Sequence, residues 1–474
     1  MTVRLDSPLT LPCGARIANR IAKAAMTEGL ATPAGRPTPA LDRLYGLWAE
    51  GGAGLLITGN VIIDPDHLER PGNVVVAGAP DAGMAAALAR WAAAGTAGGN
   101  QLWVQLSHAG RQTPKLVNPH PKAPSAVPLA LPGGRFGTPE PLSRAEIAEL
   151  VTRFAEAAAA VKAAGFTGVQ IHAAHGYLIS EFLSPLTNRR GDSYGGNLKG
   201  RARFLMEVVE AVRAAVGPDF PVSVKLNSAD FQRGGFAFTD SLTVAGWLEK
   251  AGVDLIEISG GTYEQPRMMR IKGLAAEERP AVPASTAARE AYFIDFAQAM
   301  REKLTIPLMV TGGFRHRAAM REALATGAVD LVGIARPFCV MPDVAARLLA
   351  GLEALPRPED HLRPLPRALA FLRPAAGGAC AHRLCDDLLV LRAALAAGSQ
   401  GSARRADPAA SCGAPGGTPP SGDHAGAPGR PGVRVRGKTQ PPGLRPRSGA
   451  GKARPARRPC RRSRLPPHRV PSRR

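Results

Sequence analysis

Several features that would place a protein in a membrane, outside the cell or among metal-binding proteins are missing from this chain of 474 residues. No uncharged apolar run approaches the ~20 residues needed to cross a bilayer, so we expect no membrane partner. The first eight residues contain no apolar core of a secretion signal. The six cysteines show no CxxC spacing, and we interpret them as thiols of a cytoplasmic protein.

Aromatic residues are also scarce, at 5% of the chain, and residues 401–474 contain none. These residues hold 18 Lys or Arg against 2 Asp, a net charge of +16, whereas residues 1–400 carry only +6. Because Pro, Gly, Ala, Ser and Arg cannot bury enough apolar surface to offset chain entropy, we predict a disordered basic C-terminal tail. It could be an inert extension, an arm for nucleic acid or anionic surfaces, or the result of a reading-frame accident in a GC-rich gene.

The rest of the chain alternates between short apolar runs and segments with helical spacing. The pattern predicts strands at residues 20–25, 55–58, 101–106, 168–171, 221–226, 254–259, 307–310 and 330–334. It predicts intervening helices at residues 41–50, 84–97, 144–164, 198–216, 240–251, 287–303, 316–325 and 342–350. Eight such repeats indicate an α/β protein with a (β/α)8 TIM barrel. An open doubly wound sheet is disfavoured because no GxGxxG follows the first strand.

The domain boundaries follow from the same pattern. We expect the barrel to occupy residues 1–374, with an uncertain extension at 375–400 before the tail. Residues 1–19 should form a small hairpin that leads into the barrel. The stretch 107–142 is rich in Pro, Gly and basic residues and is too long for a simple connector, so it should help to shape a substrate pocket at the barrel mouth.

The segment Gly168 to Pro185 carries the strongest chemical signal. Its buried strand runs directly into His172, His175 and Tyr177, and ligands bind at the carboxyl ends of strands in alternating folds. Two other interpretations stay open for this segment. It could be an inert polar loop, or its two histidines could bind a metal, although no third ligand is obvious.

The other strands of the predicted barrel also end in polar or glycine residues, which would share one rim. Barrel phosphate sites lie after strands seven and eight, where glycine amides and a cation meet an anion. Gly312 and Gly313 would allow close backbone approach, and Arg336 offers a forked cation. Gln105 could bind the edge of a flat polar ring, and Lys225 could stabilise negative charge on it.

The run His-Ala-Ala-His-Gly-Tyr-Leu, followed by Glu-Phe-Leu-Ser-Pro-Leu-Thr-Asn-Arg-Arg, resembles the old yellow enzyme family of FMN-dependent oxidoreductases. The resemblance implies an enzyme that takes hydride from NADH or NADPH through FMN. The positions that correspond to the family's FMN-binding residues are Ala24, Ala25, Met26, Thr27, Asn60, Gln105, Lys225, Gly312, Gly313, Ala335 and Arg336. Thr27 matches the position that tunes the flavin by a hydrogen bond.

The resemblance also implies a mechanism, in which an activated alkene is reduced. His172 and His175 would bind the carbonyl oxygen of the alkene, and Tyr177 would donate a proton to its α-carbon. An alternative on the same barrel is an NAD(P)H:flavin oxidase or quinone reductase. A non-enzyme alternative makes the barrel a support for a nucleic-acid-binding tail. We expect a small-molecule substrate, no metal, no nucleic-acid partner for the barrel itself, and a possible homo-oligomer.

Overall fold

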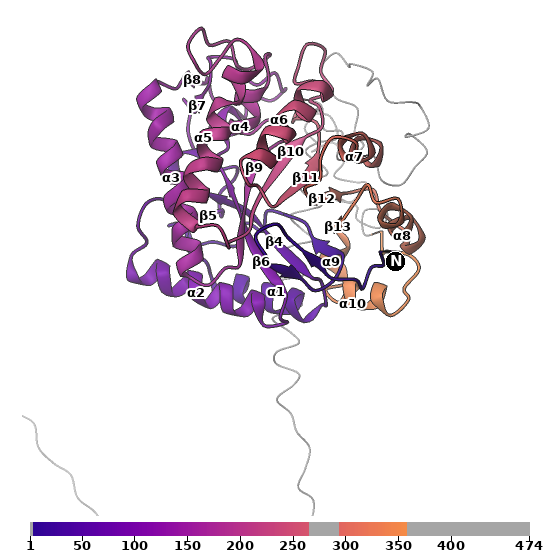
Figure 1. Cartoon of the computed structure of the whole chain (residues 1–474). Coiled ribbons are helices and arrows are strands. Elements are labelled where there is room, and N and C mark those ends of the chain that lie inside the picture. The colour runs from indigo at the N-terminus through magenta and orange to yellow at the C-terminus, as the bar shows by residue number, and fades with distance from the viewer. Residues whose placement is uncertain (1–2, 265–292, 358–474) are drawn as a thin grey trace, which may run out of the picture. The chain divides into compact units, whose positions relative to one another are not determined.

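The computed structural model describes residues 3–264 and 293–357. Eight parallel strands form a closed barrel in chain order, because the last strand pairs with the first (Figure 1). These strands are β3 (Ile21–Lys23), β4 (Leu55–Ile62), β6 (Gln101–Ser107), β9 (Gly168–Ala173), β10 (Val222–Asn227), β11 (Leu255–Ser259), β12 (Leu308–Thr311) and β13 (Leu331–Ile334). All eight lie where the sequence predicted them, and the (β/α)8 barrel is confirmed.

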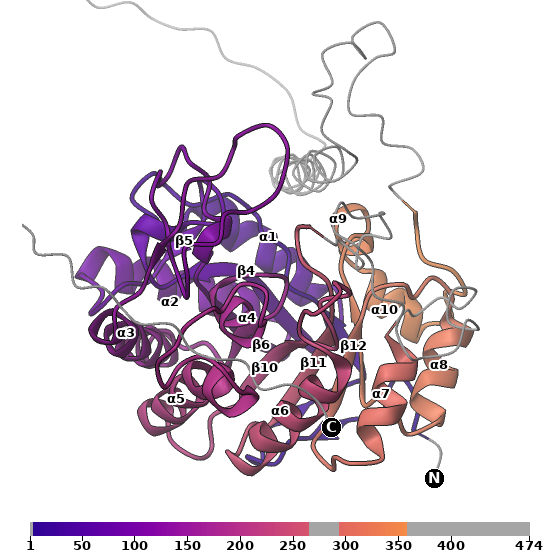
Figure 2. The same ribbon diagram turned by 90° about the horizontal axis from the view of Figure 1, so that it is seen from above.

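Helices surround the strands, as Figure 2 shows for α3, α5, α6, α7 and α8. The described helices are α1 (Pro39–Glu50), α2 (Ala82–Thr96), α3 (Arg144–Ala163), α4 (Leu178–Leu183), α5 (Leu198–Val216), α6 (Phe238–Lys250), α7 (Ile294–Arg301), α8 (Arg317–Ala325), α9 (Pro337–Val340) and α10 (Val344–Leu349), with 3-10 turns η1 (Pro65–His67) and η2 (Gly110–Gln112). None of these helices is long and apolar enough to cross a membrane.

Helix α3 illustrates why these sequences form helices. The Ser143 side chain accepts from the Glu146 N–H and the Glu146 side chain accepts from the Ser143 N–H, so the predicted capping box is present. Such a cap contributes about 1 kcal/mol to helix stability. The buried side chains of α3 recur at helical spacing, including Ile147, Leu150 and Phe154, and this face packs against α5 and the barrel.

The amino-terminal end of the barrel is closed by the predicted hairpin, which consists of β1 (Leu9–Thr10) and β2 (Arg16–Ile17). Leu9 and Ile17 pack in one buried cluster with residues at the beginnings of strands, such as Leu55 and Leu331. Apolar side chains therefore fill this end of the barrel. The opposite end, where the strands finish, is left for polar groups.

The stretch 107–142 contains η2 and a parallel pair of short strands, β7 (Lys122–Ala123) and β8 (Glu140–Pro141). A further short strand, β5 (Val74–Val75), pairs with β4. These additions were not predicted, because two-residue strands leave no periodic signal in the sequence.

Three predictions about the C-terminal half need qualification. The predicted helix 342–350 is only α10, and a separate turn of helix, α9, begins directly at Pro337 because proline suits a first helical position. The predicted helix 287–303 corresponds to α7, but its first residues lie outside the described residues. The domain boundary at 374, the extension 375–400 and the tail 401–474 also lie outside them.

Candidate active site

The barrel brings the predicted site residues to one rim, at the carboxyl ends of its strands. Neighbouring strands place them in register, since Lys225 of β10 pairs with His172 of β9, and Asn60 of β4 pairs with Gln105 of β6. The remaining residues follow the ends of their strands directly: Ala24, Ala25, Met26 and Thr27 after β3, His175 and Tyr177 after β9, Gly312 and Gly313 after β12, and Ala335 and Arg336 after β13.

The two histidines after β9 are buried and lie side by side, with ring centroids 5.0 Å apart. His172 Nδ1 accepts the Ala174 N–H at 3.2 Å, so its proton is on Nε2. His175 Nε2 is 2.6 Å from Ser259 Oγ, and when that hydroxyl donates, the proton of His175 is on Nδ1. Burial and the charge of Lys225 hold the pKa of both histidines well below the usual value. They are neutral hydrogen-bond donors, not cations.

The backbone of His175 is unusual, because a φ of 65° is a left-handed conformation that non-glycine residues rarely adopt. Two hydrogen bonds hold it there. The His175 N–H donates to Asn227 Oδ1 at 3.1 Å, and its carbonyl accepts from Gln112 Nε2 at 3.1 Å. A strained backbone held by its surroundings is common where a side chain must be aimed.

Tyr177 lies against the histidines, with its ring 4.8 Å from that of His172 at nearly a right angle. Its hydroxyl is 2.7 Å from the hydroxyl of Tyr263, which follows the end of β11. The sequence alone assigns no role to Tyr263. The signal that could have found it is a second tyrosine at the exit of another strand.

A buried chain of polar side chains crosses the interior of the barrel below this rim. Gln105 Nε2 donates to Gln170 Oε1 at 2.7 Å, and Gln170 Nε2 donates to Glu257 Oε2 at 2.9 Å. Lys225 Nζ is 2.9 Å from Glu257 Oε1. The Lys225 charge that we had expected to face a ligand is therefore paired inside the protein. Gln170 and Glu257 were missed, although a glutamate within an apolar strand is a visible signal.

A second polar group joins the exits of β3 and β4. Glu69 Oε2 accepts from Thr27 Oγ1 at 2.7 Å and from Asn60 Nδ2 at 3.3 Å. Asn60 Oδ1 is buried and has no hydrogen-bond partner in the described part of the chain. An unpaired buried acceptor at the rim suits a ligand that donates a hydrogen bond.

The exits of β12 and β13 fit an anionic group. Gly312 and Gly313 have φ values of 92° and 86°, and the space where a Cβ of Gly312 would stand is open. A phosphate can approach the backbone of such glycines without steric hindrance. The Gly312 N–H itself donates to the Gly333 carbonyl, at a long 3.4 Å. Arg336 lies at the next exit and is half-buried. Together with Asn60 and Gln105, these groups fit a flat polar ring that carries a phosphate.

One other cluster, Asp64, His67 and His108, has ligand atoms close enough to share a metal. However, His67 Nε2 accepts the Lys122 N–H at 2.8 Å, and His108 Nδ1 accepts the Gly110 N–H at 3.1 Å. The nitrogens that face Asp64 therefore carry protons, whereas metal-binding histidines donate from their outer nitrogen. We interpret this cluster as a structural hydrogen-bond network around the Asp64 carboxylate.

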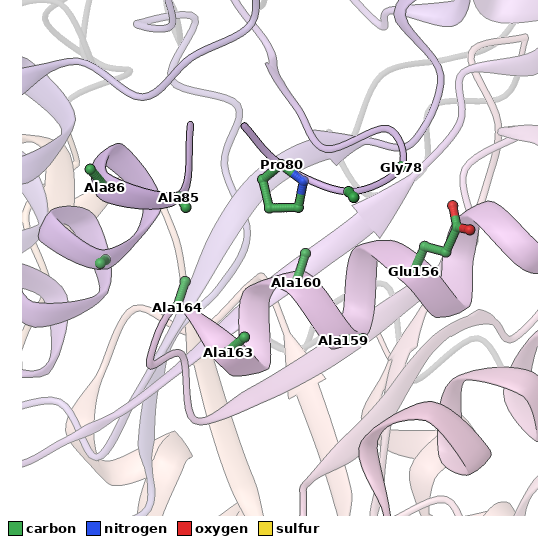
Figure 3. Close-up of a pocket in the computed structure, with 11 residues that line it drawn as sticks. Gly78, Pro80, Ala85, Ala86, Glu156, Ala159, Ala160, Ala163 and Ala164 are labelled. Carbon is green, nitrogen blue, oxygen red and sulfur yellow. The ribbon is translucent and has the colours of Figure 1, made fainter. Parts of the chain in front are cut away.

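Figure 3 shows a pocket on the outside of the barrel, between helix α3 on one side and helix α2 with the segment that leads into it on the other. It is lined mainly by alanines, and its single ionisable side chain is Glu156. Alanine methyl groups offer neither protons nor hydrogen bonds to a substrate. The strand ends, which carry hydrogen-bond donors and acceptors, are therefore the candidate active site.

Comparisons with known proteins agree with this geometry. The family described as "NADH:flavin oxidoreductase / NADH oxidase family" matches residues 5–354. The NADH-dependent flavin oxidoreductase iliE of Hypocrea jecorina (strain QM6a) is 40% identical over 353 residues, which cover 71% of this chain and 86% of that protein. The NADH-dependent flavin oxidoreductase nadA of Aspergillus parasiticus is 37% identical over 362 residues, which cover 73% and 79%.

Solved structures are similar as well. An old yellow enzyme homologue from Zymomonas mobilis has 26% identity and a TM-score of 0.63, covering 77% of this chain and 98% of that one. Morphinone reductase has 27% identity and a TM-score of 0.61, covering 76% and 92%. Morphinone reductase is also similar when solved in complex with tetrahydroNAD, at 28% identity and a TM-score of 0.61, covering 75% and 93%.

Proposed function

Because this chain belongs to the NADH:flavin oxidoreductase / NADH oxidase family, the family of old yellow enzyme, we propose that it reduces an activated alkene of the α,β-unsaturated carbonyl class. Members of the family are FMN-dependent enzymes with a nicotinamide donor, and when bound, FMN supplies the hydride. The observation that carries the proposal is the pair of neutral, buried imidazoles beside a tyrosine hydroxyl at one strand exit.

The FMN would be held by the residues around the rim, namely Ala24, Ala25, Met26, Thr27, Asn60, Gln105, Lys225, Gly312, Gly313, Ala335 and Arg336. The unpaired Asn60 Oδ1 and the open space beside Gly312 support this placement. Lys225, which pairs with Glu257 in the buried interior, would lie near the ring. The glycine pair and Arg336 would bind the phosphate.

His172 and His175 would hold the carbonyl oxygen of the substrate. Each offers a ring N–H from a neutral imidazole, on Nε2 of His172 and, when the Ser259 hydroxyl donates, on Nδ1 of His175. Their donors are positioned before the reaction by the Ala174 N–H and by Ser259 Oγ, so little reorganisation is needed as negative charge develops on the oxygen. They hold this oxygen without giving up a proton, since Tyr177 supplies it.

Tyr177 would donate the proton to the α-carbon as a general acid. Its hydrogen bond to the Tyr263 hydroxyl supports this role, because a second hydroxyl can stabilise the phenolate that remains and pass a proton to it. We therefore include Tyr263 in the proposed proton path. Its loss should slow the protonation step less than the loss of Tyr177 does.

The test combines two variants of the FMN-loaded enzyme. His172→Ala/His175→Ala should abolish tight binding of p-hydroxybenzaldehyde, whose phenolate resembles the developing enolate, and slow enone reduction by roughly 10²-fold or more. Tyr177→Phe should keep the binding of this phenol but lose the proton, so that nitroalkenes accept hydride and accumulate as nitronates.

Two results would contradict the proposal. Normal nitronate protonation by Tyr177→Phe would place the acid elsewhere. The second result is a reduced enzyme that does not turn over cyclohexenone or maleimide. If it is instead oxidised rapidly by a quinone under anaerobic conditions, or by oxygen on admission of air, the quinone reductase or oxidase alternative is favoured.

A further inference from the structure

Glu69 is a buried carboxylate beside the proposed flavin position, and nothing in the reaction described above uses it. Glu69 is 8% exposed. Its hydrogen-bond partners are the neutral Thr27 hydroxyl at 2.7 Å and the neutral Asn60 amide at 3.3 Å. The ion pairs found within residues 3–264 and 293–357 do not include Glu69, and the nearby Lys23 and His67 pair with Glu28 and Asp64 instead. A buried carboxylate without a counter-charge is costly, so its retention needs a reason.

The segment that carries Glu69 is firmly held. It follows η1, whose first turn is capped by the Asp64 side chain through the Asp66 N–H at 3.0 Å. After Glu69, the Arg70 N–H donates to Asn73 Oδ1 at 2.9 Å, and Asn73 Nδ2 donates to the Asn60 carbonyl at 3.3 Å. A loop held by these hydrogen bonds therefore positions the Glu69 carboxylate next to Thr27.

The contact with Thr27 decides what this threonine can offer to a ligand. A threonine hydroxyl has one proton, and at 2.7 Å from a carboxylate oxygen that proton is directed to Glu69. The oxygen of Thr27 also accepts from Asn60 Nδ2 at 3.5 Å, and its remaining lone pair is left for a ligand. While it donates to Glu69, Thr27 can act only as an acceptor toward a ligand.

We propose that Glu69 is a positioning residue that withdraws the Thr27 hydroxyl proton from the flavin and thereby lowers the reduction potential of bound FMN. This inference rests on the proposed placement of FMN at Thr27. A donor near the ring would stabilise the electron-rich reduced flavin, and a nearby negative charge opposes it. Glu69 therefore acts twice in the same direction, through its own charge and through the proton of Thr27.

The test is a double-mutant cycle on the midpoint potential of the FMN-loaded protein, measured against a reference dye. The variants are Glu69→Met, which removes both charge and acceptor, Thr27→Ala, and the two together. Glu69→Gln serves as a matched control that removes the charge but keeps an acceptor for Thr27. The FMN dissociation constant of each apoprotein, measured by flavin fluorescence, separates altered binding from altered potential.

We expect Glu69→Met to shift the flavin equilibrium toward the reduced form by about tenfold, which is about 30 mV for a two-electron couple. Glu69→Gln should shift it less, because Thr27 still donates to the amide oxygen. Thr27→Ala should have little effect in the wild-type background and should lower the potential in the Glu69→Met background, where the freed hydroxyl had begun to donate.

Additive effects of the two substitutions, or an unchanged potential in Glu69→Met, would overturn the inference. A wild-type protein that binds no FMN would instead overturn the proposed function, and this is measured first. The coupling between residues 69 and 27 is a readout that general loss of packing would not produce, because packing defects would change FMN affinity without a background-dependent shift in potential.

Discussion

Substitutions in the ion pair between Lys225 and Glu257 can distinguish an effect on folding stability from an effect on flavin reduction. Both side chains are buried, with exposed fractions of 4% and 0%, and their charged atoms are 2.9 Å apart. Replacing Lys225 by Met removes the cation but leaves the Glu257 carboxylate inside the barrel. Removing one partner of a buried pair costs about 3–5 kcal/mol, so we expect Lys225→Met to lower the free energy of unfolding by that amount.

A second substitution distinguishes this cost from any effect on the flavin. Glu257→Gln in the Lys225→Met background removes the stranded charge, and the new amide oxygen can still accept from Gln170. Most of the lost stability should return in the double variant. Its FMN should nevertheless be reduced by NADH at least tenfold more slowly than in the wild type, because the positive charge near the ring is absent.

The assays are urea unfolding of the apoprotein at pH 7 and anaerobic stopped-flow reduction of the loaded protein. The destabilisation of the single variant should shrink at pH 5, where protonation of the stranded carboxyl group costs less. The reasoning is refuted if Lys225→Met loses less than about 1 kcal/mol. If the double variant recovers normal flavin reduction as well as stability, Lys225 is a structural residue only.

Three further predictions concern other charged groups. Arg336→Met should raise the FMN dissociation constant by tenfold or more with little change in the flavin spectrum, as measured by fluorescence titration. Burial raises the pKa of Glu181 to about 8. The stabilising contribution of this group is therefore present below pH ~4.5 and is lost as the pH rises through 8. In urea unfolding, Glu181→Gln should accordingly gain stability relative to the wild type as the pH rises from 5 to 8. Burial lowers the pKa of His108 to about 4, so the wild type should lose stability as the pH falls from about 6.5 through 4. His108→Gln should flatten that dependence in thermal unfolding.

Each of these has an outcome that would contradict it. An Arg336→Met protein that cannot be refilled with FMN at any concentration points to misfolding rather than a lost phosphate contact. Parallel pH profiles for Glu181→Gln and the wild type would mean that the Glu181 carboxyl group ionises as readily in the folded as in the unfolded chain. An unchanged acid slope in His108→Gln would assign acid sensitivity to other groups.

The barrel itself could be predicted from the sequence because its strands are buried on both faces. Continuous apolar runs such as those in β12 and β13 can only be interior strands when helical segments separate them. The positions of His172, His175 and Tyr177 at one rim followed directly, since all parallel strands of a barrel end on the same side. The family resemblance then assigned roles that spacing alone could not.

Tertiary structure decided which polar groups pair with one another. Glu257 is 32 residues from Lys225, Glu69 is 42 residues from Thr27, and Tyr263 is 86 residues from Tyr177, so no local pattern connects them. Each pair exists because barrel closure and loop packing bring distant strand exits together. The sequence by itself determined the rim and the residues on it. The burial that keeps His172 neutral, the ion pair of Lys225 and the hydrogen bond that directs the proton of Thr27 depend on three-dimensional proximity, which spacing along the chain does not encode.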